Sequence, residues 1–153
     1  MLSTFRLFLL TILFVTLLIL AGCEDDRFRG TDFSLVPDPV DITGIVPDTL
    51  PNGTLIFDVE IGDEDFGGII ERDQGRMYYS VWANSGNGQA LESSYANANP
   101  NPIVVSLENR SPTFRQIVTG MNQGGVRAAL LPPALHQRDD TLRYDIELID
   151  ILD

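Results

Sequence analysis

The sequence is short of three residue types that carry much of the chemistry of protein sites. Among its 153 residues there are one cysteine, Cys23, one histidine, His136, and no lysine. A single cysteine has no partner in the chain, which excludes a disulfide scaffold. Because His136 has no cysteine or second histidine beside it, we expect no catalytic dyad, no metal ion and no other cofactor.

Positive charge is scarce and negative charge is abundant. The 10 basic residues are all arginine and stand against 22 acidic ones, giving a formal net charge of −12. Nucleic acids and anionic lipid headgroups both select basic clusters, so this composition argues against either as an electrostatic partner. An acidic chain without lysine is typical of salt-loving bacteria, and coding bias in a GC-rich genome is the other explanation that stays open.

The N-terminus is typical of a bacterial lipoprotein signal peptide. Arg6 precedes an unbroken run of apolar and threonine residues from Leu7 to Leu20. Small residues then precede Cys23, as a lipoprotein signal peptidase requires. We therefore predict a signal peptide over residues 1–22 and lipidation of Cys23, which would hold the protein on a membrane through two or three acyl chains. A transmembrane helix is the alternative, but the apolar run is shorter than the ~20 residues that a span needs.

Composition divides the rest of the chain into a tether and one domain. Residues 23–53 combine acids with prolines and show no sustained hydrophobic period, so we expect an extended, solvated tether after the lipidated cysteine. Residues 54–153 alternate short apolar runs with turn residues, and their number suits one domain with its own core.

The pattern of the second part predicts an α+β domain. Apolar runs, some alternating with polar residues, predict five strands separated by Gly, Asn and Pro clusters. They cover residues 55–61, 76–83, 102–107, 126–131 and 142–148. Ser111 can cap one short helix that has Pro112 at its first position, and we expect Phe114 on its apolar face to be buried against the sheet. The expected fold is a curved antiparallel sheet of five or six strands wrapped around this helix.

Three motifs follow one another in the C-terminal half. They are Gly-Met-Asn-Gln-Gly-Gly at 120–125, Leu-Pro-Pro-Ala-Leu at 131–135 and Thr-Leu-Arg-Tyr-Asp-Ile-Glu-Leu at 141–148. Their order resembles the end of the FKBP-type peptidyl-prolyl isomerases, and Asn-Gly at 87–88 before Leu-Glu-Ser-Ser at 91–94 is similar to an upstream motif of that family. The resemblance covers residues 74–152 and implies an FKBP-like fold.

The resemblance also implies an activity, acceleration of the slow cis–trans rotation of X–Pro peptide bonds. Such catalysis needs an apolar pocket that grips the proline ring and favours the twisted amide, and it needs no nucleophile or metal. The family's pocket floor falls on Phe114. Its Phe-Asp pair falls on Leu91 and Glu92, and two further aromatic positions fall on Ile103 and Tyr144.

Two strand and loop positions depart from the family pattern. The tyrosine of the family's central strand aligns with Val81. The pair whose backbone N–H holds a substrate carbonyl aligns with Arg110 and Ser111. Trp82 offers another pocket wall, but strand alternation puts it on the face opposite Val81, so we expect a surface or second-layer role.

The loop after Pro-Pro departs most. In the family it is long and supplies a tyrosine hydroxyl and an apolar flap over the substrate. Here only residues 136–140 remain, with Gln137 at the tyrosine position. Gln137 can donate an amide N–H in place of the hydroxyl or lie in a tight polar turn between two strands, and we favour the turn.

Two classes of function stay open. The first is a lipid-anchored prolyl isomerase or folding assistant of low activity in the bacterial cell envelope. The second is a non-catalytic FKBP-like module that binds a peptide or an envelope protein, and a purely structural envelope lipoprotein is a weaker third. The expected partners are proline-containing peptides or unfolded envelope proteins, with no nucleic acid.

Overall fold

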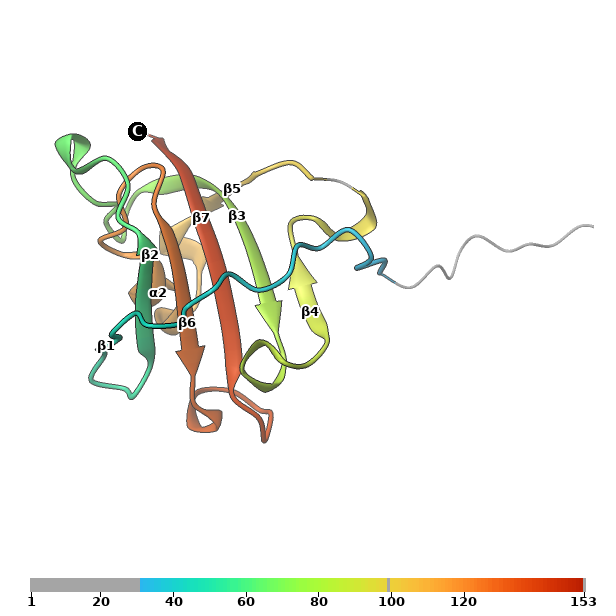
Figure 1. The fold of residues 1–153 in the computed structure, drawn as a ribbon. Helices are drawn as coiled ribbons and strands as arrows, with labels where there is room; N and C mark the ends of the chain where they lie inside the picture. Colours follow the sequence, from blue (N-terminus) through green and yellow to red (C-terminus); the bar gives the residue numbers. More distant parts are fainter. Residues whose placement is uncertain (1–30, 99, 153) are drawn as a thin grey trace, which may run out of the picture. The chain divides into compact units, whose positions relative to one another are not determined.

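One antiparallel sheet organises the domain, and its strand order differs from the order in the chain. The computed structural model describes residues 31–98 and 100–152, and in those residues seven strands pair in the order β1-β2-β6-β7-β3-β4, with β5 also paired to β3 (Figure 1). The strands are β1 (Asp48–Thr49), β2 (Leu55–Glu60), β3 (Gln74–Trp82), β4 (Ala90–Ser93), β5 (Ile103–Ser106), β6 (Val126–Leu131) and β7 (Leu142–Leu152).

The connections contain one α-helix and several single turns of 3-10 helix within the described residues. They are α2 (Pro112–Val118), η2 (Glu64–Phe66), η3 (Asn84–Gly86), η4 (Ala96–Ala98), η5 (Leu107–Asn109) and η6 (Pro133–Leu135). The predicted α+β arrangement, one short helix against a curved antiparallel sheet, is confirmed. Two strands, β1 and β4, add to those expected because runs of two and four residues are too short to show a period.

Helix α2 forms where the capping pattern predicts it. The Ser111 hydroxyl accepts a hydrogen bond from the Phe114 N–H (3.3 Å), and Pro112 occupies the first turn, where its missing N–H costs nothing. Gly120 follows with φ of 83°, a left-handed conformation that glycine adopts without strain. Ile117 and Val118 are fully buried among core residues of β3 and β7, so the helix packs through its C-terminal half.

A buried arginine joins this helix to the sheet. Arg127 on β6 is 9% exposed, and its guanidinium donates to the Ile117 carbonyl at 2.8 Å and to the Thr119 carbonyl at 3.1 Å. Its Nε donates to Asp58 on β2 at 2.6 Å. The last carbonyls of a helix have no partner within the helix, so Arg127 satisfies them and fixes where α2 ends.

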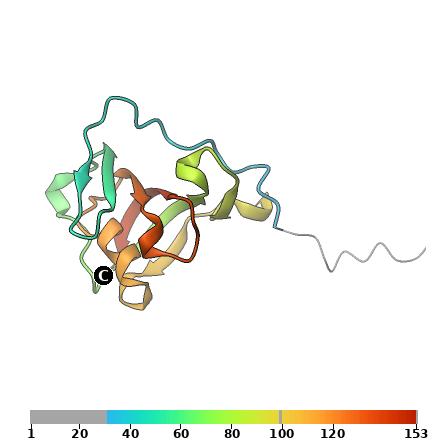
Figure 2. The same cartoon turned by 90° about the horizontal axis from the view of Figure 1, so that it is seen from below.

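The segment of residues 31–47, here called the strap, crosses the face of the sheet opposite α2 (Figures 1 and 2). Its Val40 N–H donates to Asp145 Oδ2 at 3.2 Å, and its Val40 carbonyl accepts from Arg143. Arg143 and Asp145 also pair with each other at 2.7 Å, and both side chains are at least 90% buried. Burial raises the pKa of the Asp145 carboxyl, against the opposing effect of Arg143.

The docked strap moves the boundary of the domain. The compact unit of the chain begins at Thr31, so residues 31–53, which we predicted to be an extended, solvated tether, belong to the domain and contain turns and strand β1. The predicted signal peptide, lipidation of Cys23 and tether residues 24–30 lie outside the described residues. Within the described ranges, no helix has the length and apolar character needed to cross a lipid bilayer.

Replacing Ile117 with alanine tests how α2 packs. Ile117→Ala should lower the free energy of unfolding by about 2–5 kcal/mol, because it leaves a cavity beneath a fully buried side chain. Urea denaturation followed by circular dichroism measures the change. Gln116→Ala, exposed on the same helix, is the matched control. Equal denaturation midpoints for the two variants would contradict the packing described here.

Candidate functional site

Three aromatic rings from three different elements meet at one end of α2. Phe114 packs edge-to-face against Tyr79 of β3, with ring centroids 6.3 Å apart, and against Tyr144 of β7 at 6.2 Å. They border an open cleft of about 290 Å³. The cleft is lined by Tyr79, Glu92, Asn109, Arg110, Ser111, Phe114 and Tyr144.

Phe114 is only partly buried at the edge of the core, so the prediction that it is buried against the sheet is wrong. The buried contacts of the helix come from Ile117 and Val118, one turn later, so the Phe114 ring is only partly covered by the sheet. The Arg110 guanidinium lies 5.7 Å from the Phe114 ring centroid, in the range of a cation–π contact. The floor of the cleft is therefore an accessible aromatic ring with a cation beside it.

Tyr79 provides the wall that the sequence alignment assigned to Val81. Both residues are on the same face of β3, but Val81 is 4% exposed and does not line the cleft. The Tyr79 hydroxyl donates to Glu92, 13 residues further along, and the pairing of β3 with β4 is irregular between Val81 and Trp82.

The two tyrosines of the cleft keep their protons. Burial, reinforced by the hydrogen bond to Glu92, raises the pKa of the Tyr79 phenol, and burial also raises that of Tyr144. A neutral phenol can donate a hydrogen bond, whereas a phenolate only accepts. Glu92, which the sequence predicted as a site residue, thus lines the cleft and holds the Tyr79 hydroxyl in place.

The loop before α2 presents one backbone donor. The Arg110 N–H already donates to the Leu107 carbonyl at 3.0 Å, and the Ser111 hydroxyl caps the helix. For the Ser111 N–H, the described part of the chain supplies no hydrogen-bond partner. Ser111 therefore has a backbone donor available at the lining of the cleft.

The remaining predicted site residues lie outside the lining. Leu91 and Ile103 are partly buried and pack against the core. Gln137 is exposed on the loop between β6 and β7. That loop is tied to the turn after β3, because Asp140 accepts from the Asn84 N–H at 2.9 Å, and Gln137 does not line the cleft.

Trp82, the alternative wall, lies on the opposite face of the sheet, as strand alternation predicted. It is 9% exposed and lines a hollow beneath the strap. In the described residues, no group of three or more His, Cys, Asp and Glu side chains is placed to hold a metal ion.

No protein-family model matches this sequence, and no curated protein is significantly similar to it. Solved structures are similar to it in fold. FkpA from Escherichia coli superposes with a TM-score of 0.58 at 22% identity over 69% of this chain and 51% of that one. This chain therefore matches about half the length of FkpA.

Two further structures agree with this match. A peptidyl-prolyl cis-trans isomerase from Pseudomonas syringae has a TM-score of 0.55 at 16% identity, over 70% of this chain and 81% of that one. The N-terminal domain of FKBP42 from Arabidopsis thaliana has a TM-score of 0.58 at 14% identity, over 77% and 98%. The described domain thus has the FKBP-like fold that the motifs implied.

The raised pKa of Tyr79 predicts a dependence of stability on alkaline pH. The unfolded phenol ionises near pH 10 while the folded one resists, so the contribution of Tyr79 is full below that pH and is lost as pH rises above it. One such group steepens the fall by about 1.4 kcal/mol per pH unit at most, and solvent screening of a half-buried ring lowers this.

Urea denaturation of the parent and of Tyr79→Phe at several alkaline pH values measures this effect. The phenylalanine variant should lose stability less steeply above pH 10, because it lacks the phenol that ionises on unfolding. Identical slopes for the two proteins would show that the Tyr79 phenol is not perturbed by folding.

Proposed function

We propose that this chain is an FKBP-type peptidyl-prolyl cis–trans isomerase or folding assistant of low activity, held by lipid on a bacterial membrane outside the cytoplasm. The observation that carries the proposal is the aromatic cleft formed by Phe114, Tyr79 and Tyr144. It lies in a fold shared with peptidyl-prolyl isomerases. Its ligands are proline-containing peptides or unfolded envelope proteins.

The cleft has the parts that a twisted X–Pro amide needs. Rotation is slow because it breaks the partial double bond of the amide, and the twisted state is less polar than the planar one. An apolar floor at Phe114 suits the proline ring. The Ser111 N–H and the neutral Tyr79 and Tyr144 phenols are near enough to the floor to orient flanking carbonyl groups.

The same geometry argues for low activity. The short loop after β6 is tied to the turn after β3 and places Gln137 in solvent, so this loop contributes no roof to the cleft. The Arg110 guanidinium beside Phe114 must share the ring with a bound proline or move away. A proline ring left partly in water gains little from the site, and the loss of one oriented donor typically costs about 10²–10³ in rate.

The alternative is a non-catalytic module that uses the cleft to hold a proline-containing segment. The open cleft and the short loop favour it, because binding requires contact area while catalysis requires exclusion of water. The two functions differ in one measurable quantity, the rate at which a bound peptide exchanges between its cis and trans forms.

Two-dimensional exchange NMR on an Ala-Leu-Pro-Phe peptide separates these functions. We expect the full chain in nonionic detergent to shift and broaden the peptide resonances and to accelerate cis–trans exchange weakly. Shifts without acceleration would support the binding module. Neither shifts nor acceleration at millimolar peptide would overturn both.

Phe114→Ala is the matched variant for this experiment. It removes the apolar floor, so peptide shifts and any acceleration should disappear. Gln116→Ala, on the exposed side of the same helix, should leave both intact. Equal effects of the two variants would show that the peptide binds elsewhere.

The lipid anchor is tested separately. Because the chain has one cysteine, an alkyne-labelled fatty acid fed to bacteria expressing it should mark the parent and leave Cys23→Ser unmarked. The double variant Cys23→Ser/Ser34→Cys, whose thiol lies outside the lipobox, should also remain unmarked. Labelling of either variant as strong as that of the parent would exclude Cys23 as the lipidated residue.

A further inference from the structure

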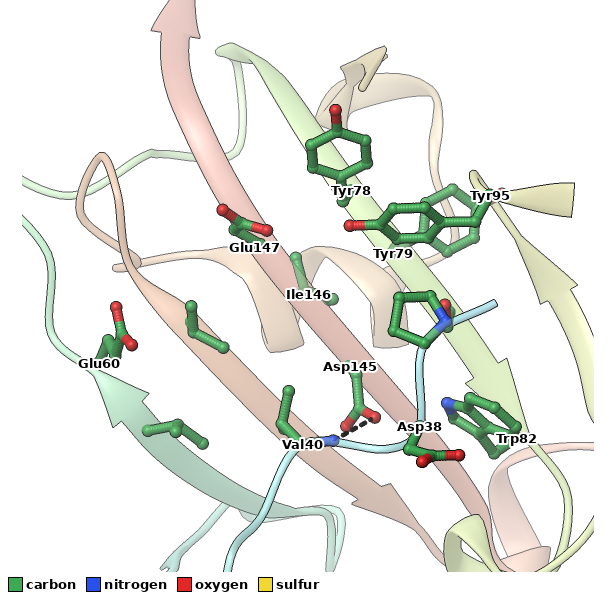
Figure 3. Close-up of a pocket in the computed structure, with 14 residues that line it drawn as sticks. Asp38, Val40, Glu60, Tyr78, Tyr79, Trp82, Tyr95, Asp145, Ile146 and Glu147 are labelled. Carbon is green, nitrogen blue, oxygen red and sulfur yellow. Dashed lines mark hydrogen bonds between the residues drawn. The ribbon is translucent and has the colours of Figure 1, made fainter. Parts of the chain in front are cut away.

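A second hollow lies on the other face of the sheet, beneath the strap (Figure 3). Its volume is about 220 Å³, and its walls come from the strap and from β2, β3, β6 and β7. Trp82, Tyr78 and Tyr95 supply aromatic surface, and the last two stack with ring centroids 4.8 Å apart. Nothing in the proposed isomerase function uses this hollow.

Two acids face this hollow in a fixed arrangement. The strand register aligns Glu60 with Val126, Val126 with Glu147, and Glu147 with Tyr78. Neighbouring strands lie about 4.8 Å apart, so the two acids flank the apolar Val126 at about 10 Å between backbones, and an aromatic ring follows. Figure 3 shows both carboxylates on the side of the hollow away from Trp82.

These two carboxylates have no cation of their own. No described residue forms an ion pair with Glu60 or Glu147. The nearby Arg143 is engaged with Asp145 and with the Val40 carbonyl. The negative charge of Glu147 also reaches across to Tyr95, where it adds to burial in raising the pKa of that phenol.

At the other end of the hollow a buried donor lacks a partner. Trp82 is 9% exposed, and its Nε1–H lies beside the Asp145 carboxylate, whose negative charge it helps to stabilise, but it meets hydrogen-bond geometry with no described residue and faces the hollow (Figure 3). A buried donor without a well-aligned acceptor is unfavourable, so a ligand that brings an acceptor to this point gains a hydrogen bond. A peptide carbonyl oxygen is such an acceptor.

We propose that this hollow binds an arginine or lysine side chain of an extended polypeptide. The cationic group lies between Glu60 and Glu147, its aliphatic stem packs on Val126 and Tyr78, and a carbonyl of the same segment accepts from Trp82 Nε1. Aromatic rings with acids at their edge favour organic cations. This site is independent of the aromatic cleft, so it stands or falls without the isomerase proposal.

The only tryptophan of the chain reports directly on this site. The probe is N-acetyl-arginine N-methylamide, added to the full chain in nonionic detergent while Trp82 fluorescence is recorded. We expect a saturable change that weakens with added salt. The citrulline analogue has the same shape and no charge, so it should bind at least tenfold more weakly, and methylguanidinium, which lacks the carbonyl, should fall between them.

Acid-to-amide variants locate the cation. Glu147→Gln and Glu60→Gln should each raise the dissociation constant about three- to tenfold, while Glu108→Gln, an exposed acid on η5, should leave it unchanged. Circular dichroism confirms that each variant is folded. Equal binding of arginine and citrulline probes, or unchanged affinity in both folded glutamine variants, would overturn the proposal. The proposal would also be overturned if the arginine probe gave neither a change in Trp82 fluorescence nor heat in titration calorimetry.

Discussion

The position of the aromatic cleft depends on one buried guanidinium. A helix of seven residues is too short to be stable by itself, so α2 exists because the sheet holds it. Arg127 on β6 holds the helix, because its guanidinium donates hydrogen bonds to the final carbonyls of α2 and to Asp58. With that end fixed, the first turn of α2 projects past the core, and Phe114 lies beside the tyrosines of β3 and β7.

Two demands on α2 are separated along its length. Its second half is buried and stabilises the domain, while its first half carries the ring that a ligand would touch. A fully buried Phe114 would add more to the core but would present no surface to a ligand in the cleft. The partial exposure of the Phe114 ring, beside the Arg110 guanidinium, is therefore what the proposed peptide binding requires, and the short loop after β6 is the reason to expect low activity.

The sequence predicted what local rules control. Ser111 and Pro112 predicted the start of the helix, and the alternation of apolar and polar residues predicted β2 and β7. The order of the motifs predicted Phe114, Glu92 and Tyr144 as site residues, and all three line the cleft. It could not place Tyr79, because the contacts of Tyr79 with Phe114 and Glu92 form only when β3, β4 and α2 come together. It also could not show that the strap docks. The partners of Val40 are the side chains of Asp145 and Arg143, more than a hundred residues away, and Val40 contacts them through its backbone N–H and carbonyl, which every non-proline residue has.

Docking of the strap also sets how far the domain can travel from a membrane. A free tether over residues 24–53 would span about 100 Å when fully extended. Because the compact unit begins at Thr31, only residues 24–30 separate it from Cys23, and seven residues span at most about 25 Å. With Cys23 as the anchor that we propose, the domain works within about its own diameter of the bilayer. On that proposal, both hollows of the domain stay within reach of polypeptides at the membrane surface.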